Sequence, residues 1–156
     1  LPDGSNPLFS DEGLRLGKAR QLGFPSVLNA TEDNVVQAVM DLTGGLGADL
    51  VIECSGAPGA IAGTVELVRK KGRICAIGLT GGKTVDFPWE KAAFKVVDIH
   101  FCLSTCYSSW DRAIHLIAGG QIPAENVITH RLPLSDWEMA FAELEAQRAL
   151  KVILHP

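Results

Sequence analysis

The stretch from residue 48 to residue 56 constrains the fold most, because it combines a short unbroken apolar run with a glycine turn. The run Leu50-Val51-Ile52 does not alternate with polar residues, which is typical of a parallel strand covered on both faces. Ser55-Gly56 predicts a tight turn, and Pro58 stands where a helix would have its first residue. In an open parallel sheet, ligands bind outside the carboxyl ends of the strands, so this turn is the first candidate site.

Glycine turns and short apolar runs recur in the same order along the rest of the chain. The strands that we expect are residues 26–28, 49–53, 73–77, 97–103 and 151–154. The helices that we expect begin near Asp11, Thr31, Pro58, Trp89, Ser108 or Ser109, and Ser135. The repeat of strand, turn, helix and strand is typical of βαβ crossovers. We therefore predict an α/β fold with a doubly wound, mostly parallel sheet.

Capping signals place several of the expected helix ends. Lys70, Lys71 and Gly72 favour the end of a helix, because cations stabilise its negative end and glycine closes its last turn. Ser135 and Glu138 have the spacing of a capping box. We thus expect the helix after the first turn to continue to about residue 71, and the last helix to be capped by Ser135.

Composition limits the classes of function. The 156 residues carry a formal net charge of -4, with 47% hydrophobic and 21% charged residues, which fits one globular domain. No cluster of lysine and arginine suggests a nucleic-acid partner, and no apolar run approaches the roughly 20 residues that a membrane span needs. The N-terminus lacks the features of a signal peptide. Four cysteines without a CxxC pair favour a reduced, cytoplasmic protein.

The histidines do not have the spacing of a metal site. They are His100, His115, His130 and His155. No HExxH or CxxC pattern accompanies them, so surface or structural roles are the simpler interpretation. Cys102 and Cys106 are more typical of small buried residues than of ligands. We therefore assign no metal ligand to this chain.

A series of short motifs stands in a fixed order along the chain. They are residues 15–23, 42–49, 51–56, 72–73 with 77–78, 97–99, 128–134 and 151–154. In this order and spacing, which runs from about Asp11 to the end, the chain resembles the carboxyl-terminal, cofactor-binding part of the medium-chain dehydrogenase/reductase family. Its zinc-dependent alcohol and polyol (sorbitol-like) branch is the closest.

The resemblance implies a Rossmann-like domain that is incomplete in this chain. Residues 1–156 would be part of an NAD(P)-binding domain, without the catalytic zinc domain that supplies the metal ligands in the family. The first strand and the GxGxxG turn that cradles the pyrophosphate are absent from the sequence. The parent enzyme would transfer hydride between a small-molecule secondary alcohol or polyol and nicotinamide. We expect this chain alone to be inactive and to contain no catalytic residue.

The resemblance also assigns cofactor contacts to three strand ends and two cations. The adenine-ribose side would be lined by Cys54, Ser55 and Gly56. The nicotinamide end would be contacted by Ile77, Gly78 and Leu79, and also by Leu103 and Ser104. Arg15 would lie near the adenosine and Lys151 near the pyrophosphate. For the glycines an ordinary turn is the alternative, and for the cations a solvated surface position.

The choice between NAD and NADP stays open. The acid that selects NAD should lie just upstream of Arg15, and family spacing places Ser10 there, although Asp3 or Asp11 would serve with a different loop length. A small hydroxyl followed by an arginine tolerates a 2′-phosphate.

The apolar strand around residues 98–104 predicts a homo-oligomer. In the family this strand lies at the sheet edge and pairs across a two-fold axis, and an open apolar edge favours such pairing. Two other functions remain as alternatives. One is a non-catalytic dimerising α/β module, and the other is a zinc-free quinone or enoyl reductase relative, which the motif at residues 128–134 disfavours.

Overall fold

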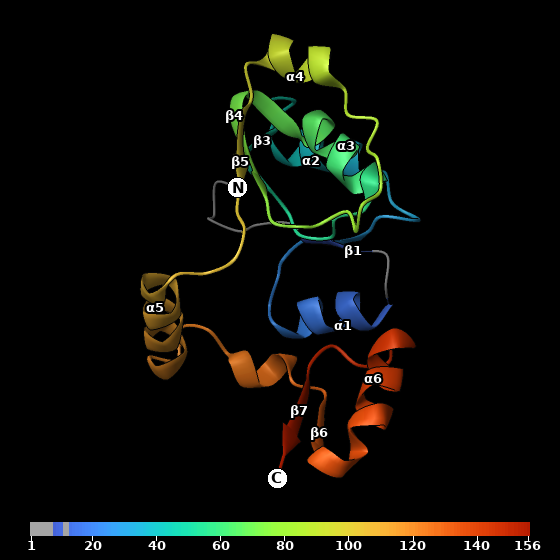
Figure 1. Cartoon of the computed structure of the whole chain (residues 1–156). Helices are drawn as coiled ribbons and strands as arrows, with labels where there is room; N and C mark the ends of the chain where they lie inside the picture. Colours follow the sequence, from blue (N-terminus) through green and yellow to red (C-terminus); the bar gives the residue numbers. More distant parts are fainter. Residues whose placement is uncertain (1–7, 11–12) are drawn as a thin grey trace. The chain divides into compact units, whose positions relative to one another are not determined.

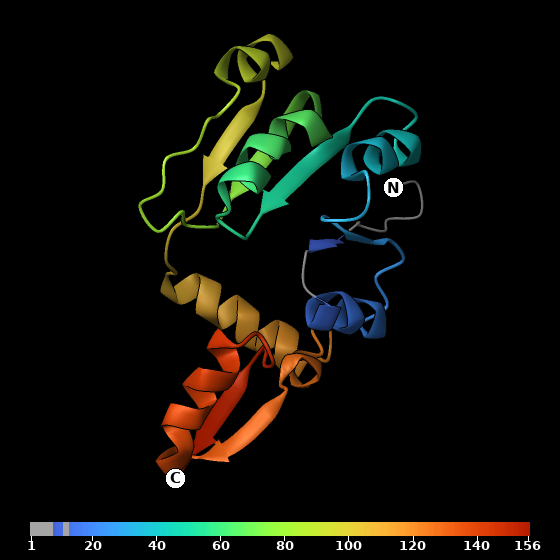
Figure 2. The same ribbon diagram turned by 90° about the vertical axis from the view of Figure 1, so that its right-hand side faces the viewer.

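The computed structural model describes residues 8–10 and 13–156, with no side chain described before residue 13, and divides into two compact units (Figures 1 and 2). Unit 2 is residues 34–104, and unit 1 joins residues 1–33 to residues 105–156. The elements of unit 2 are α2 (Val35–Leu42), β3 (Ala48–Glu53), α3 (Pro58–Leu67), β4 (Val68–Ala76), α4 (Trp89–Lys95) and β5 (Asp98–Phe101). Those of unit 1 are β1 (Leu8–Ser10), α1 (Gly13–Gln21), β2 (Val27–Asn29), α5 (Tyr107–Ala118), η1 (Ala124–Val127), β6 (His130–Pro133), η2 (Leu134–Asp136), α6 (Trp137–Glu145) and β7 (Val152–His155).

Unit 2 is built on a three-stranded parallel sheet in the order β3-β4-β5. Ile52 pairs with Cys75, and Cys75 pairs with His100, so the carboxyl ends of all three strands lie at one edge (Figure 2). The strand at residues 49–53 and its parallel neighbours are confirmed. This edge is where an open parallel sheet binds its ligands.

The core of unit 2 lies between one face of the sheet and the helices that pack on it. Val51 and Ile74 point from the sheet into this core, where they meet Val65 of α3 and Val68. Ala92 of α4 completes the buried cluster. Because successive side chains on a strand point to opposite faces, one residue in two along β3 reaches this core.

The opposite face of β3 is exposed. Leu50 is 48% exposed and Ile52 is 56% exposed, whereas Val51 between them is buried. The prediction of a strand covered on both faces is therefore wrong for the described chain. The unbroken apolar run was a correct signal of a strand, but α3 and α4 pack on one face only.

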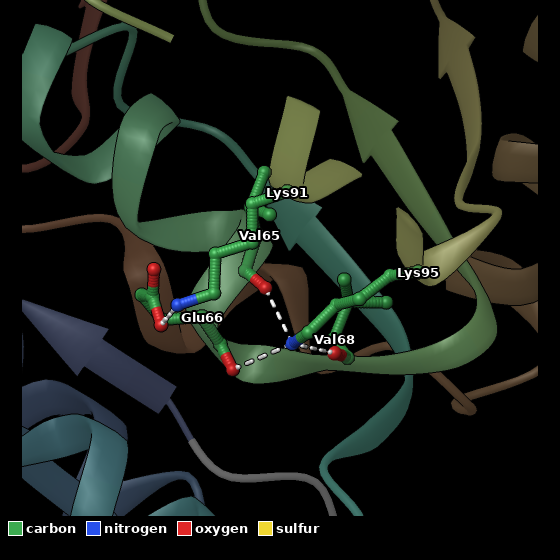
Figure 3. Close-up of polar contacts among 5 residues, drawn as sticks. All are labelled: Val65, Glu66, Val68, Lys91 and Lys95. Carbon is green, nitrogen blue, oxygen red and sulfur yellow. Dashed lines mark hydrogen bonds and ion pairs between the residues drawn. The ribbon is translucent and has the colours of Figure 1, made fainter. Parts of the chain in front are cut away.

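The carboxyl end of α3 is completed by a lysine from a distant element (Figure 3). The Lys95 ammonium at the end of α4 donates to the carbonyls of Val65 and Val68 at 2.7 Å each and of Glu66 at 3.3 Å. Beside it, Lys91 forms an ion pair with the Glu66 carboxylate. Burial lowers the pKa of Lys95 below its usual value. Lys95 thus satisfies helix carbonyls that have no partner within the helix.

The expected end of this helix near residue 71 is wrong. α3 ends at Leu67, and Gly72 lies inside β4 rather than at a helix end. A Cβ on Gly72 would approach Val68 Cγ2 to 2.6 Å, so close packing explains this glycine. Lys70 and Lys71 are exposed residues of β4.

Three expected caps also differ from the structure. The N-cap of α2 is Asn34, whose side chain accepts from the Gln37 N–H at 3.0 Å, and not Thr31. The N-cap of α5 is Cys106, which lies two residues before Ser108, the nearer of the two expected caps. α6 begins after Asp136 without a side-chain cap, because Ser135 lies inside the preceding turn η2 and not at the N-cap position; its hydroxyl donates to the Asp136 carboxylate.

Unit 1 contains two pairs of parallel strands, each with a helix. β1 pairs with β2 beside α1, and β6 pairs with β7 beside α6. The buried apolar residues of unit 1 are mostly small: Leu16, Ala19, Ala140 and Ala149. Among the described residues, no helix is long and apolar enough to cross a membrane.

Candidate functional site

The turns after β3 and β4 touch each other through their backbones. The N–H groups of Ile77 and Gly78 donate to the Glu53 carbonyl at 2.8 and 3.1 Å. A Cβ on Gly78 would lie 2.1 Å from the Gly56 nitrogen, and a Cβ on Gly56 would lie 2.1 Å from the Leu79 oxygen. Gly56 also has a φ of +69°, which L residues with a side chain rarely adopt. Both glycines are therefore required by the close approach of the two turns.

A buried carboxylate holds the first turn in place. Glu53 is 5% exposed, and its Oε1 accepts from the Ser55 N–H at 2.8 Å, the Ser55 hydroxyl at 2.6 Å and the Gly56 N–H at 3.0 Å. Hydrogen bonds to an ionised acceptor are stronger than neutral ones. We call Glu53, Ser55, Gly56 and Gly78 the strand-end junction. Sequence reasoning missed the role of Glu53; a carboxylate that ends a buried strand two residues before a serine was the available signal.

Exposed side chains surround the junction at the same edge of the sheet. Cys54 and Ser55 are exposed beside β3, and Ile77 and Leu79 are 47% and 73% exposed beside β4. The Ser55 hydroxyl is engaged within the turn, since it also accepts from the Ala57 N–H at 3.1 Å. The edge thus offers backbone polar atoms next to apolar side chains.

The third strand adds Leu103 and Ser104 to this edge. The Cys102 N–H donates to the Ala76 carbonyl at 2.9 Å, which continues the β4–β5 pairing by one residue. Leu103 is 78% exposed, and Ser104 has a φ of +62°. The structure therefore brings the predicted residues of all three strand ends to one edge of unit 2.

The predicted cations belong to unit 1. Arg15 is exposed on α1, and Lys151 is exposed just before β7, with its carbonyl accepting from the Thr129 N–H at 2.9 Å. Asp3 and Asp11, two alternatives for the acid that selects NAD, lie outside the described residues, as does the side chain of Ser10.

The expectation of buried cysteines is wrong. Cys54, Cys102 and Cys106 are exposed, and Cys75 is half-buried. Cys75 and Cys102 lie with their sulfurs 3.5 Å apart. The strands are short, so residues at their ends leave the core, and the strand predicted at residues 97–103 is three residues longer than β5.

Metal ligands do not converge in the described part of the chain. No three side chains of histidine, cysteine, aspartate or glutamate there lie close enough together to hold an ion. His115 approaches Asp111 on the exposed side of α5, as expected for an i,i+4 pair. The described residues therefore do not fit a zinc ion.

Comparisons with known proteins agree with this geometry. Residues 9–119 match the family described as zinc-binding dehydrogenase. The chain is 32% identical to a sorbitol dehydrogenase of Halalkalibacterium halodurans over 148 residues, 95% of this chain and 43% of that protein. It is 31% identical to a D-arabitol-phosphate dehydrogenase of Enterococcus avium over 140 residues, 90% of this chain and 40% of that protein.

Solved structures show the same fold. An alcohol dehydrogenase from Thermus sp. ATN1 superposes with a TM-score of 0.90 at 27% identity, over 98% of this chain and 44% of that one. An alcohol dehydrogenase from Thermotoga maritima gives 0.89 at 29% identity, over 97% and 43%. The chain spans about two fifths of the length of the curated relatives. The Rossmann-like fold class is confirmed, and the chain belongs to the zinc-binding dehydrogenase family.

Proposed function

We propose that this chain is the cofactor-binding part of an NAD(P)-dependent dehydrogenase that acts on a secondary alcohol or polyol. The observation that carries the proposal is the strand-end junction, where two glycines bring the turns after β3 and β4 into backbone contact. The glycines fix how the two turns meet, and the exposed side chains beside them line the edge at which an open parallel sheet binds its ligands. The names of the sorbitol and arabitol-phosphate relatives support a polyol as substrate.

The residues at this edge fit the flat rings and ribose hydroxyls of a dinucleotide. Ile77, Leu79 and Leu103 offer exposed apolar surface for a ring to pack on. Cys54 and Ser55 line the neighbouring turn, where we place the adenine-ribose side. When bound, the nicotinamide supplies the hydride acceptor, and the chain's own residues orient it and shield it from water.

Two cations of unit 1, each considered by itself, are further proposed cofactor contacts. Arg15 and Lys151 would serve as counter-charges for the adenosine phosphate and the pyrophosphate. The phosphate cradle itself is not in this sequence, because no GxGxxG pattern occurs in the 156 residues. We assign zinc and the substrate-binding residues to a part of the parent protein outside this chain. A titration with both cofactors decides between NAD and NADP.

We also propose a homo-oligomer that pairs through residues 98–104, in a reducing compartment such as the cytoplasm. β5 is an edge strand of its sheet, and Phe101 and Leu103 are 81% and 78% exposed. An exposed apolar edge favours pairing with a second copy. The four unpaired cysteines support a reducing compartment. A monomer in light scattering at micromolar concentration would contradict the oligomer.

The test of cofactor binding compares two leucines of equal exposure. Leu79 lies beside the strand-end junction and Leu46 precedes β3 at the opposite end, and both are 73% exposed. In the full-length gene product, we expect Leu79→Glu to weaken NAD(P) binding by about tenfold or more, equal to about 1.4 kcal/mol. Leu46→Glu should leave the affinity unchanged.

Calorimetric titration with NAD and with NADP measures both variants. Equal affinities in the two variants and the unaltered protein would place the cofactor elsewhere. If neither cofactor binds the full-length protein, the non-catalytic α/β module becomes the better interpretation. We expect the 156-residue chain by itself to bind more weakly than the full-length product, because the phosphate cradle is missing.

A further inference from the structure

Three cysteines lie on one face at the carboxyl edge of the unit 2 sheet. Cys75 is near the end of β4, Cys54 follows β3, and Cys102 follows β5. The register pairs Ile52 with Cys75 and Cys75 with His100. Because side chains alternate along a strand, residues two apart share a face, so all three thiols point to the same side of the sheet.

Two of these thiols are already in contact. The Cys75 and Cys102 sulfurs are 3.5 Å apart. The hydrogen bond to Cys102, followed by burial, raises the pKa of Cys75. In the single chain Cys102 is exposed and Cys75 is half-buried, so an oxidant reaches Cys102 first when the strand at residues 98–104 is not paired with a second copy.

We propose that Cys75 and Cys102 are an oxidative modification site, at which a peroxide converts the two thiols into a reversible intramolecular disulfide. The proposal goes beyond the proposed function, because it needs neither cofactor nor substrate.

The reaction balances with hydrogen peroxide as the two-electron oxidant. The Cys102 thiolate attacks one peroxide oxygen, so an S–O bond forms and the O–O bond breaks, and the departing hydroxide takes up a proton to become water. The Cys75 sulfur then attacks the Cys102 sulfenic acid. An S–S bond forms, the S–O bond breaks, and the second hydroxide leaves as water with the Cys75 proton.

The two cysteines are offset in the register of β4 and β5, so closure of the disulfide needs a local movement. Cys75 pairs with His100, so Cys102 is two residues beyond its direct partner. Their sulfurs are 3.5 Å apart, whereas the bond in a disulfide is about 2.0 Å long. Closure must therefore draw the end of β5 toward β4 and disturb the Cys102 N–H bond to Ala76. A strained disulfide is easier to reduce.

Cys106 is the competing thiol. The hydroxyls of Ser108 and Ser109 lie 3.0 and 3.3 Å from its sulfur and lower the pKa of Cys106 to about 7. Its thiolate fraction at neutral pH is therefore high, and it should react early with peroxide or iodoacetamide. The neighbours of Cys106 are serine hydroxyls, which cannot form a disulfide with it. The site is therefore identified by which two cysteines become linked, and not by which thiol reacts first.

The experiment maps the cross-link by mass spectrometry. The reduced 156-residue chain is treated with hydrogen peroxide, its remaining thiols are alkylated, and the peptides are analysed without reductant. We expect one Cys75–Cys102 link and its removal by dithiothreitol. Cys75→Ser and Cys102→Ser should abolish the link, whereas the control variants Cys54→Ser and Cys106→Ser should retain it.

A second readout follows the backbone. In the oxidised chain, the Cys102 amide should exchange its hydrogen faster, while Val51 and Ile74 in the core of unit 2 keep their protection. A link through Cys54 or Cys106 would overturn the proposal. So would oxidation of Cys102 to sulfinic acid without a Cys75 link.

Discussion

The two ends of the unit 2 sheet are held by different kinds of interaction. At the carboxyl end, the strand-end junction joins backbone to backbone around the buried Glu53 carboxylate. At the amino end, exposed ion pairs join the strands: Arg69 with Asp49, and Arg73 with Asp98. Exposed pairs gain little because water and salt screen them, whereas a buried acceptor that loses its donors keeps its full desolvation cost. The edge with the candidate site is therefore the less tolerant of change.

Adding one carbon at the junction should have the largest effect on stability. Gly78→Ala places a Cβ 2.1 Å from the Gly56 nitrogen and 2.4 Å from Glu53 Oε2. We expect the free energy of unfolding to fall by about 3 kcal/mol, the upper range for overpacking. Urea denaturation followed by far-UV circular dichroism measures it.

The matched control is Gly59→Ala on α3, where an added Cβ meets nothing within 4 Å. Alanine favours a helix over glycine, so this variant should be unchanged or more stable by up to about 1 kcal/mol. If both variants lose the same stability, the junction has no special role.

Removing the charge at the junction tests the buried carboxylate. Glu53→Gln keeps the shape of the side chain but replaces one acceptor oxygen with a donor. We expect a loss of about 2 kcal/mol, since the Ser55 and Gly56 donors face a weaker acceptor. Glu66→Gln, which alters an ion pair with Lys91, is the control and should cost less. Equal losses in urea unfolding would show that burial of Glu53 is unimportant.

Lys95 should have an effect between those of the backbone junction and the exposed ion pairs, because its charged side chain bonds to backbone carbonyls. Lys95→Met keeps the aliphatic stem and removes the three contacts to the end of α3. We expect a loss of about 1 kcal/mol, with faster hydrogen exchange at the last turn of α3. Lys91→Met serves as the control, and protection in α3 that does not differ between the two variants would contradict the capping role.

The smallest effect should come from the amino end. The Arg69 guanidinium lowers the pKa of Asp49 below its ordinary value of 3.8, first by a hydrogen bond and then by its charge. A lowered carboxyl pKa contributes stability that is fully present above pH 3.8 and is lost as the pH falls through the lower folded value. The difference between the unaltered chain and Asp49→Asn should thus be flat near neutral pH, shrink in acid and vanish in 1 M salt. A difference that persists in high salt would require another cause.

Most elements of the fold follow from local signals, but the strands β1 and β6 were not expected, and the other errors concern element ends. The strand at β3 and the turn at Ser55-Gly56 follow from an apolar run and a glycine, both of which act within a few residues. The end of α3 does not follow from local signals. Lys95, which donates to the last turn of α3, is 28 residues beyond Leu67 in the sequence (67 to 95). Ser135 had a capping spacing, but the turn η2 contains Ser135 and moves the start of α6 to the residue after Asp136.

The sequence predicts which strand ends meet at the candidate edge, but not the side-chain contacts there. Parallel strands place their carboxyl ends together, so Gly56, Gly78 and Leu103 were expected at one edge before any coordinates. The burial of Glu53 and the contact of Cys75 with Cys102 were not, because they depend on the register of three strands. Register is set by packing between elements, which spacing along one element does not reveal.

The two glycines of the junction have a consequence for sequence variation. Each missing Cβ faces backbone atoms of the other turn, and backbone cannot be exchanged for something smaller. In a library of random substitutions, positions 56 and 78 should therefore both retain glycine, and no second-site change should rescue either one. Because both positions require a residue without a side chain, no pair of complementary side chains can vary together there.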